Sequence, residues 1–152
     1  MKALTLYQPW AHLVAIGAKT IETRSWKTNY RGPLAIHAGV NTQFAFHGKH
    51  YICDTEPFYS VLQADSEKFH RTMSFGAIIA TCELVGCEFI DDHQLCWQRG
   101  TRTWMLTAQE LAFGDFTPGR YAWFLADIKK LMSPIIVKGA MGLWEWVDTN
   151  VW

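Results

Sequence analysis

Short apolar segments separated by glycine and proline constrain the fold of this chain most strongly. They fit β-strands, because their residues alternate or form brief apolar runs between turn residues. These segments span residues 3–6, 21–24, 34–37, 75–89, 121–128, 134–137 and 143–147. Helical patterns follow Pro9, lie between Phe58 and Phe69, and cover 108–113, where Thr107 and Glu110 form a capping-box pattern. The combination predicts an α+β fold in which a curved β-barrel carries short helices at its rim.

Length and composition predict one domain that spans residues 1–152. The chain has 152 residues, of which 49% are hydrophobic, enough to fill one core. No apolar run reaches about 18 residues, so we expect no membrane span. Residues 1–5 lead directly into a strand pattern and do not resemble a signal peptide, which predicts a cytoplasmic protein. We also expect a monomer.

The cysteines and histidines do not form a convincing metal site. Cys53, Cys82, Cys87 and Cys96 form no C-x-x-C pair and are expected to be reduced thiols. One weak set is His47, His50 and Cys53, and another is Cys87, His93 and Cys96. In a helix, the first spacing drifts by about 60°, and neither set has an evident fourth ligand. We therefore expect no metal and no cofactor.

The sequence Gly-Ala-Lys-Thr-Ile-Glu-Thr-Arg at 17–24 places Lys19, Glu22 and Arg24 within six positions. Gly17 ends a helical pattern, and the strand after it puts Glu22 and Arg24 on one face. Lys19 lies at the turn that leads into this strand. The three side chains could converge to hold a polar, planar ligand. The alternative is a surface ion pair beside a solvated lysine.

Four further segments accompany this motif. They are L-Y-Q-P-W-A at 6–11, Y-R-G-P-L-A-I-H-A at 30–38, P-G-R-Y-A-W at 118–123 and G-L-W-E-W at 142–146. In this order the set resembles the ASCH domain family, whose signature reads G-x-K-x-x-E-x-R, and the resemblance covers residues 2–146. It implies a fold related to the PUA domain and a nucleic-acid or nucleotide context. The resemblance does not imply one particular activity.

The charge distribution bears on the partner. The net charge is zero, which argues against binding by non-specific phosphate attraction alone. Residues 1–50, however, hold six bases and one acid, whereas residues 51–152 hold eight bases and thirteen acids. Either the first third forms a cationic face, or folding interleaves the two parts and cancels the asymmetry. The expected partner is RNA, another single-stranded nucleic acid or a nucleotide.

Binding is the function that the motif favours. The candidate ligand-binding residues are Lys19, Glu22, Arg24, Trp26, Arg31 and Trp10. The two cations can meet phosphate or carbonyl oxygens, and Glu22 can accept a hydrogen bond from an exocyclic amine or orient the arginine. Trp10 or Trp26 could stack on a base, or could simply pack in the core.

Catalysis is the second hypothesis. Some ASCH proteins are amidohydrolases that act on N4-acetylcytidine, and the resemblance implies a motif lysine, a threonine and a separate glutamate there. Lys19 matches, but Glu22 occupies the threonine position and makes the lysine a poorer base. The catalytic candidates are Lys19, Glu22 and Glu83, and Glu83 either pairs with Lys19 or Arg24 or lies at the sheet rim. A ribonuclease that uses His37 or His12 as acid or base is a further alternative.

Overall fold

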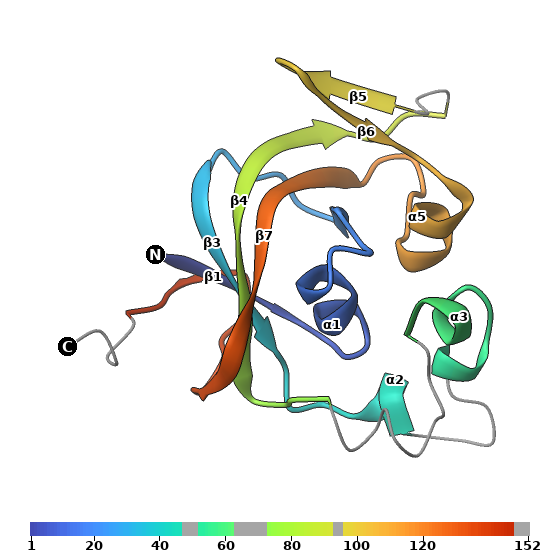
Figure 1. Cartoon of the computed structure of the whole chain (residues 1–152). Coiled ribbons are helices and arrows are strands. Elements are labelled where there is room, and N and C mark those ends of the chain that lie inside the picture. Colours follow the sequence, from blue (N-terminus) through green and yellow to red (C-terminus); the bar gives the residue numbers. More distant parts are fainter. Residues whose placement is uncertain (47–51, 63–72, 93–95, 148–152) are drawn as a thin grey trace.

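The computed structural model describes residues 1–46, 52–62, 73–92 and 96–147. Its centre is a mixed six-stranded sheet in the order β2-β7-β4-β3-β1-β8. The strands are β1 (Lys2–Leu6), β2 (Ile21–Arg24), β3 (Gly32–Ala38), β4 (Ala77–Phe89), β7 (Tyr121–Ile136) and β8 (Leu143–Glu145). β1 and β3 run parallel, and the other neighbours are antiparallel. Figure 1 shows that this sheet curls into a half-barrel, which confirms the predicted α+β fold with a curved sheet.

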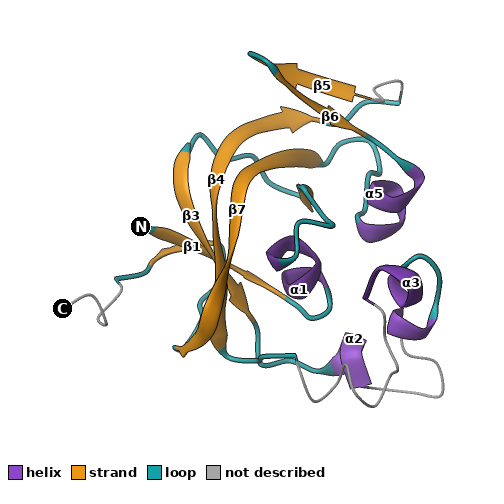
Figure 2. Ribbon diagram, in the orientation of Figure 1, coloured by secondary structure: helices purple, strands orange, loops and turns teal. Residues whose placement is uncertain are grey.

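Short helices lie on the inner side of the curl (Figure 2). They are α1 (Trp10–Ala15), α2 (Gln43–Phe46), α3 (Phe58–Leu62) and α5 (Ala108–Phe113), with a 3₁₀ turn at Ile52–Asp54. α1 packs its buried face, including Val14, against Leu34 and Trp123 of the sheet. Apolar side chains of this size each contribute about 1.5–3 kcal/mol when fully buried. The main core therefore lies between α1 and the concave face of the sheet.

β7 keeps the predicted alternation only along its first part. Trp123 and Leu125 pack in the core around α1, while Phe124 packs on the opposite face, as predicted. Asp127 then adopts φ 51°, which interrupts the alternation. Ile128, predicted on the face of Phe124, therefore packs in the core with Trp123 instead. The separate strand predicted over 134–137 is also wrong, because β7 runs through Ile136.

Residues 96–105, which lie outside the segments whose patterns indicate strands, form a β-hairpin. Its strands are β5 (Cys96–Arg99) and β6 (Arg102–Met105), which pair antiparallel. Gly100, with φ 59°, begins the two-residue turn, a position that favours glycine. Trp97 and Trp104 lie opposite each other and contact Phe124, with ring centroids 5.3 and 5.1 Å away. The hairpin thus covers the outer face of β7.

Two other expectations concern metals and membranes. Within the described ranges, no three His, Cys, Asp or Glu side chains form a group that could hold a metal ion. His47, His50 and His93 lie outside the described residues. No helix in the described part of the chain is long and apolar enough to cross a membrane.

Candidate ligand-binding cleft

The turn after α1 places the motif. Gly17 has φ 75°, a conformation that only glycine adopts readily. Ala18 N and Lys19 N both donate to Leu13 O, at 2.9 and 3.1 Å, so the helix ends in a tight reversal. The chain then enters β2, which pairs with the start of β7. Lys19 therefore lies at the turn that leads into the strand, as predicted.

Lys19 is buried behind this strand. Only 1% of the residue is exposed, its Nζ donates to Ile21 O, and Nζ lies 3.6 Å from Glu22 Oε2. The alternative of a solvated lysine is therefore wrong. Lys19 does not line the cleft that Glu22 and Arg24 border, and its contact with the cleft wall is through Glu22.

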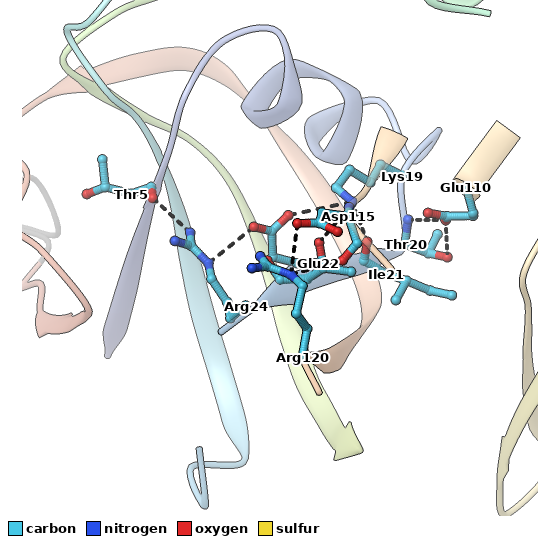
Figure 3. A network of polar contacts seen from close by, with 10 residues as sticks. Thr5, Lys19, Thr20, Ile21, Glu22, Arg24, Glu110, Asp115 and Arg120 are labelled. Carbon is cyan, nitrogen blue, oxygen red and sulfur yellow. Dashed lines mark hydrogen bonds and ion pairs between the residues drawn. The ribbon is translucent and has the colours of Figure 1, made fainter. Parts of the chain in front are cut away.

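Glu22 and Arg24 point to the same side of β2, as the strand period predicts (Figure 3). Glu22 Oε1 lies 3.2 Å from Arg24 Nε, and Arg24 Nη2 donates to Thr5 O at 3.1 Å. The Glu22 carboxylate thus lies between the Lys19 ammonium and the Arg24 guanidinium. The carboxylate therefore has an ion-pair partner on each side.

A segment from the other half of the chain faces this strand. Glu110 Oε1 accepts hydrogen bonds from Thr20 N at 2.6 Å and Thr20 Oγ1 at 2.9 Å. Farther along, Asp115 N donates to Thr23 Oγ1 at 3.1 Å, and Arg120 Nε lies 3.3 Å from Asp115 Oδ2. These contacts, drawn in Figure 3, hold residues 110–120 beside β2.

Between these elements lies a cleft of about 580 Å³, a volume in the range of small-molecule sites. Glu22 and Arg24 form part of its wall, together with Trp10 and Trp26. Its remaining lining comes from Thr5, Tyr7, Thr23 and the segments 112–115 and 140–142. The cleft therefore joins four parts of the chain that are distant in sequence.

Both tryptophans combine packing with access to the cleft. Trp10 is half-buried and meets the rings of Phe44 and Phe58 edge-on, with centroids 5.2 and 6.2 Å away. Trp26 is also half-buried and meets Trp123 edge-on at 4.6 Å. The two interpretations of these residues, core packing and ligand contact, are thus compatible.

Other candidate residues lie away from the cleft lining. Arg31 is exposed and donates to Thr28 O and Tyr30 O. Glu83 is half-buried on β4, across from Pro33 and Ala126. The ion pairs of the described residues do not include Glu83, and its predicted partners both pair with Glu22.

The two histidines considered for ribonuclease chemistry also lie outside the cleft lining. Burial, followed by the nearby Lys130 charge, lowers the pKa of His12 to about 4. Burial lowers the pKa of His37, although its Nε2 lies 3.0 Å from Val137 O. His37 is 1% exposed and so has little contact with solvent.

Folding pairs half of the bases in the first third of the chain with two carboxylates. Lys2 pairs with Glu145 from the other end of the chain, and Lys19 and Arg24 pair with Glu22. Lys49 lies outside the described residues. Lys27 and Arg31 are exposed and belong to none of the ion pairs between described residues. Positive charge in this region is therefore concentrated just after Trp26.

Sequence reasoning did not identify several residues of the cleft. Tyr7, Asp115 and Met141 line it, and Arg120 supports Asp115. Tyr7 and Arg120 lie within segments 6–11 and 118–123, which accompany the motif and gave a signal that they serve the same site. Asp115 and Met141 lie in turns without a comparable pattern.

Two curated proteins match part of this chain in sequence. Activating signal cointegrator 1 of Homo sapiens is 29% identical over 84 residues, which are 55% of this chain and 14% of that protein. The Mus musculus protein of that name matches over the same shares, also at 29% identity. The chain thus spans a small part of these relatives.

Among solved structures, a mutant ZmASCH protein from Zymomonas mobilis superposes with a TM-score of 0.47 and 19% identity, over 89% of this chain and 74% of that one. The family model described as the ASCH domain matches residues 4–134. Because this match covers most of the 152 residues, the chain belongs to the ASCH domain family.

Proposed function

We propose that this protein binds single-stranded RNA and holds one unpaired base in the cleft beside Glu22. The observation that carries the proposal is the fixed pair of Glu22 and Arg24 on the wall of a cleft that Trp10 and Trp26 also line. The pair offers a hydrogen-bond acceptor next to a donor. Every nucleobase has donors and acceptors on its edge and a flat face that stacks on aromatic rings, so such a wall suits a base.

The charges around the cleft favour a base over a phosphate. Lys19 and Arg24 both contact Glu22, and Arg120 contacts Asp115, so these three cations each face a carboxylate. A phosphate would have to compete with these carboxylates. We therefore assign phosphate contacts to the exposed Lys27 and Arg31, which come after Trp26 in the chain.

Family membership supports a nucleic-acid context but does not indicate a particular reaction. Lys19 Nζ donates to Ile21 O and lies outside the cleft lining, so it does not face a ligand held there. Hydrolysis of an N4-acylated cytidine and cleavage of RNA therefore remain alternative functions. The activities of the cointegrator proteins are not transferred, because the match covers 14% of their length.

The test compares two ion-paired arginines. Arg24→Gln removes the proposed base contact, and Arg102→Gln is the matched control, because Arg102 pairs with Asp127 outside the cleft. We expect Arg24→Gln to weaken binding of a labelled single-stranded RNA at least fivefold, and Arg102→Gln to change it less than twofold. Equal losses would indicate diffuse electrostatics and contradict the site. Turnover of N4-acetylcytidine or of the RNA, measured in the same samples, would favour the alternatives.

We further propose that residues 1–152 act as a monomeric single domain in the cytoplasm. The four cysteines form no disulfide with one another, which suits a reducing compartment. One cooperative unfolding transition and a monomer mass in sedimentation would support the domain and the oligomeric state. Cell fractionation would test the location.

A further inference from the structure

Two exposed aromatic rings lie beside the cleft. Tyr7 comes directly after β1 and is 46% exposed, and Phe44 lies on α2 and is 38% exposed. Their ring centroids are 5.2 Å apart, with 51° between the ring planes. Phe44 also meets Trp10 edge-on at 5.2 Å. Because Tyr7 and Trp10 both line the cleft, this exposed pair is continuous with it.

The pair is the outer end of a row of rings that otherwise belongs to the core. From Trp10 the row continues to Phe58 and Phe113, with centroids 6.2 and 4.8 Å apart. Phe58 and Phe113 are only 3% and 1% exposed, so these inner rings pack as core side chains do. Large aromatic side chains contribute most when they are buried. Tyr7 and Phe44 are only partly buried, so part of the stabilisation from burying their rings is still available where the cleft meets the surface.

We infer that Tyr7 and Phe44 form a second stacking subsite, so that the ligand is at least two consecutive nucleotides of a single strand. This inference rests on the proposed function. One base occupies the cleft beside Glu22, and its neighbour stacks on the Tyr7–Phe44 pair. Stacking tolerates any base because every base has a π face. The second subsite therefore distinguishes a dinucleotide from a single nucleotide, and the cleft recognises the hydrogen-bonding edge of the base.

The size and character of the pair favour a base over a protein partner. A specific protein interface buries about 800 Å² on each partner, which is far more than two partly exposed rings provide. A nucleobase is a flat group of about the size of one ring system and needs no larger apolar surface.

The experiment separates the second base from the second phosphate. The probes are 5′-AMP, the dinucleotide pApA, and a pApA analogue that keeps the second ribose and phosphate but lacks the second base. We expect the wild-type protein to bind pApA at least fivefold more tightly than the abasic analogue. Since the two dinucleotides carry the same charge, the difference reports the second base alone.

Variants assign that difference to the rings. Phe44→Ala should abolish it, because the substitution removes one ring of the pair. Tyr7→Ala should also abolish it, whereas Tyr7→Phe should preserve it. Tyr59→Ala is the matched control, because Tyr59 is 50% exposed and lies outside the cleft lining.

Three outcomes would overturn the inference in distinguishable ways. If 5′-AMP binds and Arg24→Gln weakens it, but the abasic analogue binds as tightly as pApA, the proposed function stands and the second subsite is wrong. If none of the probes binds, both are wrong. A difference between the dinucleotides that survives both Phe44→Ala and Tyr7→Ala would place the second base elsewhere.

Discussion

Glu110 and Thr20 are 90 positions apart, yet one carboxylate oxygen of Glu110 accepts two hydrogen bonds from Thr20, from N at 2.6 Å and Oγ1 at 2.9 Å. Glu110 is 6% exposed, so this contact is shielded from water. It joins α5 to the start of the motif strand. The position of Lys19 and Glu22 therefore depends on a residue from the other half of the chain.

Removing this carboxylate should destabilise the protein. Glu110→Ala leaves the two donors of Thr20 without their acceptor, which we expect to lower the free energy of unfolding by about 2 kcal/mol. Glu110→Gln keeps one amide oxygen as an acceptor and should lower the free energy of unfolding by a smaller amount. Denaturant titration measures both. The control is Thr107→Ala, which removes the α5 cap and should cost about 1 kcal/mol. A loss at Glu110→Ala no larger than at Thr107→Ala would show that the Thr20 contact contributes little.

The buried Lys19 should matter more for stability than an exposed lysine. Lys19→Met leaves the Glu22 carboxylate in a nearly buried position with only Arg24 as partner, and we expect a loss of about 3 kcal/mol. Lys2→Met, whose partner Glu145 is exposed, should leave the unfolding midpoint unchanged. Adding Glu22→Leu to Lys19→Met should restore part of the stability. No recovery in the double variant would contradict the role given to the ion pair.

His12 should make the folded state sensitive to acid. Burial and Lys130 lower its pKa to about 4 from 6.5, so the folded state binds fewer protons than the unfolded chain below pH 6.5. Its contribution is thus fully present above that value and is lost as the pH falls toward 4. With allowance for partial exposure, the loss at pH 5 is about 1–2 kcal/mol. His12→Gln should reduce the drop in unfolding free energy between pH 7.5 and pH 5 by this amount. The same drop in both proteins would contradict the prediction.

Local patterns predicted the elements whose boundaries are set by nearby residues. β2 runs from Ile21 to Arg24, as its alternation indicates, and Thr107 caps α5. The prediction was wrong where the backbone conformation of one residue changes the side of the strand on which the following residues lie. Asp127 is not a glycine, so its positive φ and the reversal at Ile128 had no clear sequence signal. The turn at Gly100 did have one, since Gly-X between alternating segments is typical of a hairpin.

The sequence predicted how the site residues of one strand are arranged, but it did not predict their contacts with residues of other elements. The period of β2 is enough to place Glu22 beside Arg24, because alternate residues share a face. Nothing in that period shows that Lys19 is buried, which depends on packing around the turn after α1. Glu110 carried a capping signal, and its helix is capped as predicted, but its side chain binds Thr20 instead of completing the box. Tertiary contacts of this kind leave no local pattern.

The salt dependence of RNA binding should be shallow and should map to two residues. Each phosphate contact with a single strand contributes about −0.7 to the slope of log K against log salt, so two or three contacts predict a slope of about −2. Lys27 and Arg31 are exposed bases outside the described ion pairs, and the double variant Lys27→Gln, Arg31→Gln should make the slope shallower by about 1.4. The double variant Lys129→Gln, Lys130→Gln removes two exposed bases of β7. It is the control and should leave the slope unchanged.

Arg24→Gln should instead weaken binding at every salt concentration, because Arg24 is assigned to the base. Titration of one labelled oligomer at four salt concentrations separates these effects. A slope several times steeper, or one that changes equally in both double variants, would mean that the strand tracks a broad basic surface and not a path from Trp26 to Arg31.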